Sequence, residues 1–227
     1  MTNRYTLGTE NHAGKRINAT EGGEKIMLVT EMLDLIKKMI AQLPMVRSAR
    51  NDQLRTEIAT RIAGQILTDD ERATFLGLPE GCRIREGAKI LSPENLTLGK
   101  RCWIGENAVL DASGGLTIGD DCSIGLSVFI WSHTSHLTNL GRDNQTNSSL
   151  IKRNSTSIGS GVFIAGPSVV LSGTTIGDDV VVRPFSTVSG VVESGSLVEG
   201  LTVTPNVFTP ERVKRMIEKH LGESEVT

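Results

Sequence analysis

The sequence has few aromatic residues, almost no net charge and no long apolar run. Its 227 residues include five Phe, two Trp and one Tyr, and 24 Lys plus Arg stand against 26 Asp plus Glu, a net charge of -2. This composition argues against nucleic-acid binding, which needs a basic surface or an aromatic platform for the bases. A membrane span needs about 18 consecutive apolar residues, and no stretch approaches that length. We therefore expect no nucleic-acid partner and no membrane span.

Cysteine is also scarce. The sequence has Cys82, Cys102 and Cys122, an odd number, and the N-terminal run MTNRYTLGTENHAGKR has no apolar signal-peptide core. A disulfide framework needs paired cysteines and an oxidising compartment. We therefore expect free thiols and a cytoplasmic localisation.

Composition and periodicity divide the chain into four stretches. Residues 1–23 are polar and rich in Gly, Asn and Thr, which predicts a mobile tail. Residues 24–77 have apolar residues at helical spacing and form the predicted N-terminal helical region. Residues 78–200 carry the repeat described below, and residues 201–227 form a C-terminal segment that ends in a helix.

The helical stretches carry recognisable end signals. Thr68-Asp-Asp-Glu71 is a capping-box signature, and Thr209-Pro210 is typical of a helix start. We expect the apolar faces of the first two helices to pack against a partner or against the next domain. The residues of these faces would be Leu28, Met32, Leu35, Ile36, Met39, Leu43, Leu54, Ile58, Ile62 and Ile66.

Glycine is abundant, at 24 residues, and much of it belongs to a repeat of six residues. An aliphatic residue, often followed by glycine, recurs with this period, and equivalent positions are 20 residues apart up to Ile130 and 18 apart after Ile158. Three short strands joined by tight turns form one triangular coil in this pattern, and the coils stack at strand spacing, about 4.8 Å. The repeated positions are Ile84, Ile90, Leu98, Ile104, Leu110, Ile118, Ile124, Ile130, Ile158, Ile164, Val170, Ile176, Val182 and Val188.

The cysteines fit the same register. Each lies four residues after the aliphatic residue that opens a coil, at positions that hold Ala or Val in other coils. We therefore predict a column of small, buried thiols and no metal site at the cysteines.

Three motifs carry a resemblance to a known family. LGKRCWIGENAVL, TIGDDCSIGLSVFIW and SIGSGVFIAGPSVVLSGTTIGDDVVV, within residues 84–188, resemble the hexapeptide-repeat acyltransferases. The resemblance implies a mainly β fold, a left-handed parallel β-helix, here with an N-terminal helical region and a C-terminal helix. It also implies a homotrimer with acetyl-CoA as acyl donor. The acceptor would be a sugar hydroxyl or amine, in surface-polysaccharide (including lipopolysaccharide) or nucleotide-sugar biosynthesis.

One long insertion interrupts the repeat. Residues 132–157 read SHTSHLTNLGRDNQTNSSLIKRNSTS, a polar stretch without secondary-structure periodicity that holds two of the four histidines. A long excursion from a rigid scaffold is a common place for function. The resemblance implies that a histidine at this loop is the general base, a role that suits imidazole because its free pKa is about 6.5. His136 is favoured by its register, one residue from the family position, and His133 stays open because some relatives use a histidine at the corner of the coil.

The acceptor is expected to contact polar or aromatic side chains near this loop. Glu106, Asn107 and Asp111 occupy coil corners one coil earlier, and Trp131 directly precedes the insertion. Corner residues of these types are also ordinary turn formers. Trp131 could line the acceptor pocket or pack against a neighbouring subunit.

The resemblance also implies a donor site along the coils after the loop. Small residues there would let acetyl-CoA approach the backbone. Arg212, Lys214 and Arg215 could meet the CoA phosphates or form a solvated helix face. The expected cofactor-binding residues are Gly161, Phe163, Ala165, Gly166, Ser168, Arg183 and Gly200.

Two other functions fit a β-helix. A non-catalytic scaffold or assembly subunit needs no long loop with two histidines, so the insertion argues against it. His133-x-x-His136 is similar to part of the zinc site of the γ-class carbonic anhydrases. A catalytic zinc needs three protein ligands, and the repeat region has only these two histidines. We therefore expect no metal.

Overall fold

The computed structural model describes residues 19–42, 48–140 and 150–215. The chain divides into two compact units, Met1–Pro79 and Glu80–Thr227. The division falls two residues after the predicted end of the helical region at residue 77. Each unit is described by itself.

The first unit is helical. Helices α1 (Ala19–Gln42), α2 (Ala49–Gly64) and α3 (Asp69–Phe75) follow one another. Helix α1 begins inside the stretch that was predicted to be a tail. The predicted capping box opens α3, where the Thr68 backbone N–H donates to Glu71 at 3.0 Å.

Helices α1 and α2 pack on each other mainly through residues outside the predicted faces. Val29 and Leu33 of α1 pack with Ala59 and Ala63 of α2, together with Leu67. Most residues of the predicted faces are exposed in the single chain, and Leu43 lies outside the described residues. The exposed members are Leu28, Leu35, Met39, Leu54, Ile58, Ile62 and Ile66.

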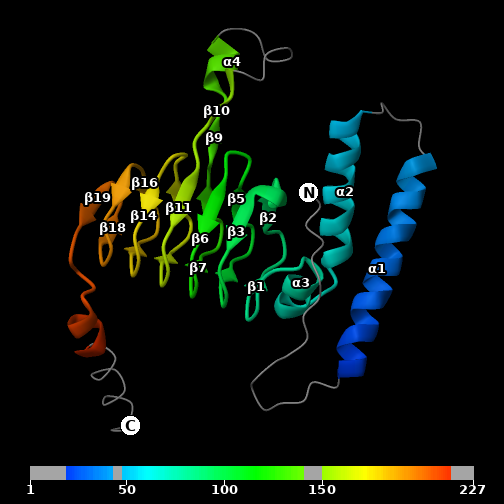
Figure 1. Ribbon diagram of the computed structural model, residues 1–227, viewed down its shortest axis with the longest axis horizontal. Helices are drawn as coiled ribbons and strands as arrows, with labels where there is room; N and C mark the ends of the chain where they lie inside the picture. Colours follow the sequence, from blue (N-terminus) through cyan, green and yellow to red (C-terminus); the bar gives the residue numbers. More distant parts are fainter. Residues whose placement is uncertain (1–18, 43–47, 141–149, 216–227) are drawn as a thin grey trace. The chain divides into compact units, whose positions relative to one another are not determined.

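The second unit is a parallel β-helix, as predicted. Within the described residues, its strands stack into sheets A, B and C, one for each side of the triangular coil (Figure 1). Sheet A contains β1 (Arg83–Ile84), β4 (Trp103–Ile104), β7 (Ser123–Ile124), β12 (Phe163–Ile164), β15 (Val181–Val182), β18 (Leu197–Glu199) and β19 (Thr202–Thr204). Sheet B contains β2 (Lys89–Leu91), β5 (Val109–Asp111), β8 (Phe129–Ile130), β13 (Val169–Val170) and β16 (Thr187–Val188). Sheet C contains β3 (Leu96–Leu98), which follows the short helix η1 (Pro93–Asn95), then β6 (Leu116–Ile118), β11 (Thr156–Ile158), β14 (Thr175–Ile176) and β17 (Val191–Val192).

The strand register follows the sequence period. Ile84 pairs with Ile104, 20 residues on, and Ile164 pairs with Val182, 18 residues on. Val182 then pairs with Val198, so the last coil is shorter still. The repeated aliphatic side chains point inward, and most of them are fully buried. The sequence period thus predicted both the strand pairing and the core.

The three cysteines form the predicted column. All are free and buried, and the Cys102 backbone N–H donates to Cys82 Sγ at 3.4 Å. The thiols of Cys102 and Cys122 each donate to a glycine carbonyl of the next coil at 3.1 Å. They therefore act as small core residues that tie successive coils together.

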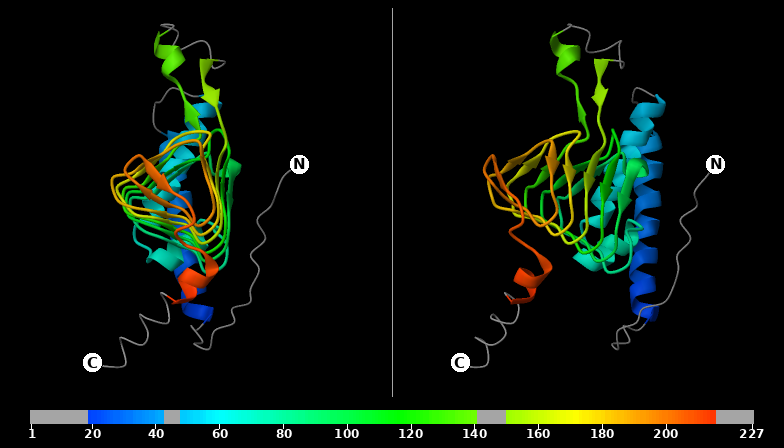
Figure 2. Two further views of the ribbon diagram at one scale, coloured as in Figure 1. Left: turned by 90° about the vertical axis from the view of Figure 1, so that its left-hand side faces the viewer. Right: turned by 60° about the vertical axis from the view of Figure 1, so that its left-hand side comes forward.

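The chain leaves the β-helix between β8 and β11 to form an arm, residues 133–153. The arm contains β9 (His133–Thr134), α4 (His136–Leu140) and β10 (Lys152–Arg153), with β9 and β10 paired antiparallel. Both views of Figure 2 show these three elements projecting from the edge of the coils. The arm falls within the expected insertion, residues 132–157, but it contains secondary structure, and the coil resumes at Thr156 rather than after residue 157.

A hairpin ends the β-helix. Strand β19 folds back antiparallel onto β18 through Gly200 and Leu201. The C-terminal helix begins at Pro210, and the Arg212 backbone N–H donates to the predicted N-cap Thr209 at 3.4 Å. The described part of this helix is residues 210–215.

Candidate functional site

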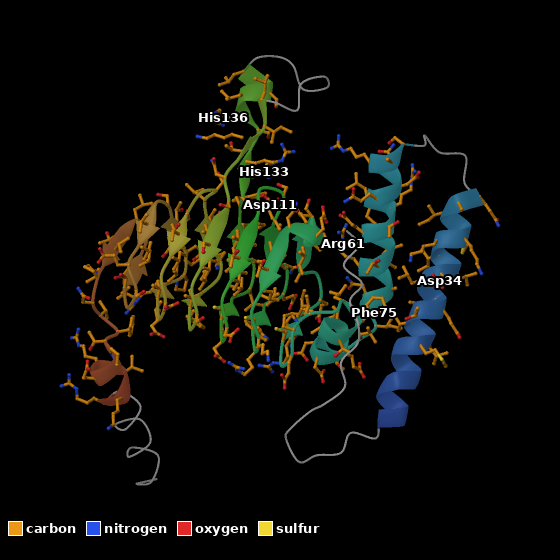
Figure 3. The ribbon with its side chains drawn as sticks, viewed as in Figure 1. Asp34, Arg61, Phe75, Asp111, His133 and His136 are labelled. Carbon is orange, nitrogen blue, oxygen red and sulfur yellow. The ribbon has the colours of Figure 1, made fainter. Side chains whose placement is uncertain are left out.

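The base of the arm holds a histidine against a buried carboxylate. His133 Nδ1 lies 2.6 Å from Asp111 Oδ2 and 2.8 Å from Ser113 Oγ. The Asp111 side chain is 1% exposed, whereas that of His133 is 28% exposed. In Figure 3, Asp111 lies below His133 at the point where the arm leaves the coils. The imidazole is therefore anchored on one side and open on the other.

Ser132, the first residue of the insertion, helps to hold His133 over Asp111. Asp111 ends β5 at the corner between sheets B and C, one coil before the arm. Asp111 Oδ2 accepts from the Ser132 backbone N–H at 2.9 Å, and Oδ1 accepts from the Ser113 backbone N–H at 3.1 Å. Ser132 Oγ in turn accepts from the Gly114 backbone N–H at 2.8 Å. These bonds clamp the start of the arm to the preceding coil.

Hydrogen bonding keeps Asp111 ionised. Burial is the largest single influence and raises the pKa of Asp111, because a carboxylate is poorly solvated in the interior. Hydrogen bonds from Ser132, Ser113 and His133 together outweigh it and hold the pKa below its usual range. Asp111 therefore carries a negative charge at neutral pH.

This charge fixes the tautomer of His133. A carboxylate accepts hydrogen bonds only, so the proton between the two side chains belongs to Nδ1 of His133. In the described part of the chain, the ring hydrogen bonds of His133 all use Nδ1. Nε2 is left with its lone pair, and the adjacent carboxylate stabilises the imidazolium that forms when Nε2 takes a proton.

Aromatic rings continue the row of side chains that leads to His133. Trp131 meets His133 edge to face, with ring centroids 6.2 Å apart, and stacks on Phe129 at 6.4 Å. Trp131 is half-buried. It therefore limits the orientations of the imidazole and forms an apolar wall beside it.

His136 has a different environment. It is the exposed first residue of α4, farther out along the arm (Figure 3). Its Nδ1 lies 2.8 Å from Thr134 Oγ1, two residues away, and no carboxylate contacts it among the residues described. The sequence argument favoured His136, but the structure gives the fixed, carboxylate-bound environment to His133.

Two of the four predicted acceptor residues, Asp111 and Trp131, contact His133 among the residues described. Asp111 is buried beneath His133, so it holds the imidazole and is not exposed to an acceptor. Glu106 and Asn107 form the turn between β4 and β5, at the corner between sheets A and B. The arm leaves from the next corner, between B and C, so these two residues do not line its base.

Several predicted donor residues serve the coil itself. Ser168 is buried, and its hydroxyl donates to the Arg183 carbonyl at 3.1 Å. Gly161 has a φ of 68°, which its turn requires, and a Cβ on Gly166 would collide with the Leu126 carbonyl. The stacking of coils therefore explains why Ser168, Gly161 and Gly166 are small residues. Phe163 and Arg183 are exposed, Ala165 is half-buried, and Gly200 forms the terminal hairpin turn.

Arg183 takes part in a cavity at the end of the β-helix. The cavity has a volume of about 550 Å³ and lies between the outer face of sheet A and the C-terminal segment. Arg183, Arg212 and Arg215 line it together with apolar side chains, so three cations surround a partly apolar space. Lys214 is absent from its lining. The apolar lining consists of Val181, Leu197, Val207 and Phe208.

Ser113 and Ser132 are site residues that the sequence did not predict. Ser113 lies 20 residues before His133, which is one coil period. The period therefore carried a signal that Ser113 and His133 are stacked neighbours. Ser132 had no comparable signal, because its contact with Asp111 depends on how the arm leaves the coil.

Two observations concern metals and membranes. The described residues contain no group of three or more His, Cys, Asp or Glu side chains placed to hold a metal ion. None of the helices in the described part of the chain combines the length and apolar character that a membrane crossing requires.

Comparisons with known proteins agree with the repeat. Residues 95–130 match the hexapeptide repeat of succinyl-transferase, and residues 155–190 match the bacterial transferase hexapeptide. These segments flank the arm and include the coils on either side of it. No curated protein matches the sequence.

Solved structures share the fold. The hexapeptide-repeat acetyltransferase of Vibrio cholerae is 22% identical, with a TM-score of 0.61, over 77% of this chain and 96% of that one. The same protein from Vibrio cholerae O1 biovar eltor, complexed with acetyl coenzyme A, is 24% identical, with a TM-score of 0.54, over 69% of this chain and 87% of that one. At this identity the similarity establishes the fold alone.

Proposed function

From a β-helix built of the hexapeptide repeats of bacterial transferases, we propose that this protein is an acetyltransferase that moves an acetyl group from acetyl-CoA to a sugar hydroxyl or amine. The observation that supports the proposal most is the His133–Asp111 pair at the base of the arm. It supplies an oriented base at a partly exposed position, which acyl transfer to a weak nucleophile requires. The acetyl-CoA complex of the similarly folded Vibrio cholerae protein agrees with this donor.

The mechanism is direct transfer. The acceptor hydroxyl or amine donates a hydrogen bond to His133 Nε2, and the imidazole removes its proton as the oxygen or nitrogen attacks the thioester carbonyl carbon. The tetrahedral intermediate collapses with cleavage of the carbon–sulfur bond, and the CoA sulfur leaves with the proton returned by the imidazolium. Asp111 stabilises the imidazolium between these steps. The buried cysteines take no part in it.

The site is proposed to lie between copies of a homotrimer. The expected donor residues Ala165 and Gly166 lie at the corner between sheets A and B. His133 lies at a different corner of the same chain. A neighbouring β-helix could place its own A–B corner beside the arm, so the trimer would combine the base of one copy with the donor groove of another.

The arginine-lined cavity is proposed to hold the phosphates of CoA. Arg183, Arg212 and Arg215 provide guanidinium groups that pair well with phosphate. The apolar lining suits the adenine ring. We propose a cytoplasmic location, where the free cysteines stay reduced.

Calorimetric binding of acetyl-CoA tests the donor. We expect micromolar affinity for acetyl-CoA and CoA, and at least about tenfold weaker binding of 3′-dephospho-CoA. Arg212→Gln with Arg215→Gln should remove most of that difference. Lys214→Gln is the matched control, since it removes a charge from the same helix without altering the cavity lining. A folded protein that binds none of the three compounds would contradict the proposal.

A further inference from the structure

Arg153 lies directly across the arm from His133. In the antiparallel pair of β9 and β10, Arg153 is the register partner of His133, and Lys152 is the partner of Thr134. Residues opposite one another in such a pair project from the same face, with Cβ atoms about 5 Å apart. The Arg153 side chain therefore shares a face with the imidazole, and Lys152 belongs to the other face.

Arg153 has no evident structural task. Its side chain is exposed and forms no hydrogen bond or ion pair with any residue that the structure describes. Arg101 of the β-helix differs, because its guanidinium makes two bonds to Asp121, at 2.6 and 2.7 Å. An unpaired guanidinium beside an oriented base is available to a ligand.

Asp111 carries the nearby negative charge, but its carboxylate does not form an ion pair with Arg153. Asp111 is 1% exposed, and its oxygens already accept from Ser132, Ser113 and His133. A guanidinium prefers a planar or tetrahedral oxyanion that it can bind with two N–H groups. Carboxylates and phosphates are the common biological groups with this geometry.

We infer that Arg153 binds an anionic group of the acceptor, a carboxylate or phosphate that lies a few bonds from the reacting hydroxyl or amine. This inference rests on the proposed function and narrows its acceptor to anionic sugars. Trp131 bounds the same face on the side of the coils. The acceptor then spans the arm, with its nucleophile at His133 Nε2 and its charge at Arg153.

A test can observe His133 itself without any acyl donor. The protein has four histidines, so selective isotope labelling gives few ring signals, and His133→Asn assigns the relevant one. The protein is titrated with glucuronate, glucose 6-phosphate and glucose, at constant ionic strength. We expect glucuronate, glucose 6-phosphate or both to shift the His133 signal saturably, and glucose to leave it unchanged at the same concentration.

Two variants then distinguish a specific contact with Arg153 from a general effect of positive charge. Arg153→Gln should weaken the binding of the anionic sugar at least about tenfold, the effect of losing one charged hydrogen-bonding partner. Lys152→Gln removes an equal charge from the other face and should change the affinity less than twofold.

The proposal fails if none of the sugars shifts the signal, if glucose shifts it as strongly as the charged sugars, or if Arg153→Gln binds as the unaltered protein does. The titration contains no acetyl-CoA, so its failure is distinguishable from a failure to bind CoA. A response to only one charged sugar identifies whether carboxylate or phosphate is recognised.

Discussion

Aspartates at two corners of the β-helix have different roles. At the corner between sheets C and A, Asp120 accepts from the Lys100 backbone N–H at 2.8 Å, and Asp178 accepts from the Ser160 backbone N–H at 2.7 Å. Each carboxylate reaches back one coil and satisfies a turn. These bonds are exposed and repeat along the corner, so they join one coil to the next.

At the corner between sheets B and C, Asp111 is covered by the arm. It also accepts backbone hydrogen bonds, but one of its oxygens holds His133. The repeat thus provides carboxylates at its corners, and the insertion brings one of them into contact with a histidine.

His133 and His136 should differ most. His133→Asn should lower kcat for acetyl transfer by about 10²- to 10⁴-fold, because it removes the base. His136→Asn should change kcat less than about threefold, since Thr134 is the one described residue to which its ring is bound. Steady-state kinetics with a saturating acceptor measure both. The reverse order would show that the base lies farther out on the arm.

Asp111 should have the next largest effect. Asp111→Asn should lower kcat by about 10- to 100-fold, because an amide can impose the other tautomer on His133 and cannot stabilise the imidazolium. Asp178→Asn is the matched control and should keep the rate. An equal loss of kcat in Asp111→Asn and Asp178→Asn would mean that Asp111 has only a structural role.

Asp178 should matter for stability instead. Asp178→Ala removes the acceptor for the Ser160 N–H and should lower the free energy of unfolding by about 1 kcal/mol. The kcat of the folded protein should stay unchanged. Urea unfolding of the variant gives the free energy, and kinetics on the same sample give kcat. A loss of activity without a loss of stability would contradict the division between corners.

A smaller change is expected in the free energy of unfolding at low pH. The pKa of Asp111 is lower in the folded protein than its usual value, so the carboxylate stabilises the fold above about pH 4 and this contribution is lost as the pH falls further. The difference in unfolding free energy between the unaltered protein and Asp111→Asn should therefore narrow below about pH 4. Urea unfolding at pH 7 and pH 3 compares them. A difference that widens in acid would mean that the folded-state pKa is raised.

Local sequence determined the scaffold. The six-residue period predicted which side chains point inward, and the 20- and 18-residue spacings predicted the strand register. It also located the insertion and the cysteine column. These features follow from the sequence alone because each coil contacts only its neighbours, so one spacing recurs along the whole β-helix.

The helical pattern predicted an apolar stripe on α2 but did not predict which face of the helix meets α1. The aliphatic residues of α2 form a clear stripe in the sequence, whereas the contact with α1 uses Ala59 and Ala63. Periodicity identifies a face, but the choice between two apolar faces depends on how closely a partner helix can approach.

The site depended on the tertiary structure. The proposal of His133 rather than His136 rests on Asp111, which is 22 residues away from His133 and meets it only because the arm starts directly over the preceding corner. The pairing of Arg153 with His133 depends on how the two ends of the arm align. The repeat determined the coils by short-range spacing, whereas the insertion follows no period, so only its folded path decided which side chains meet.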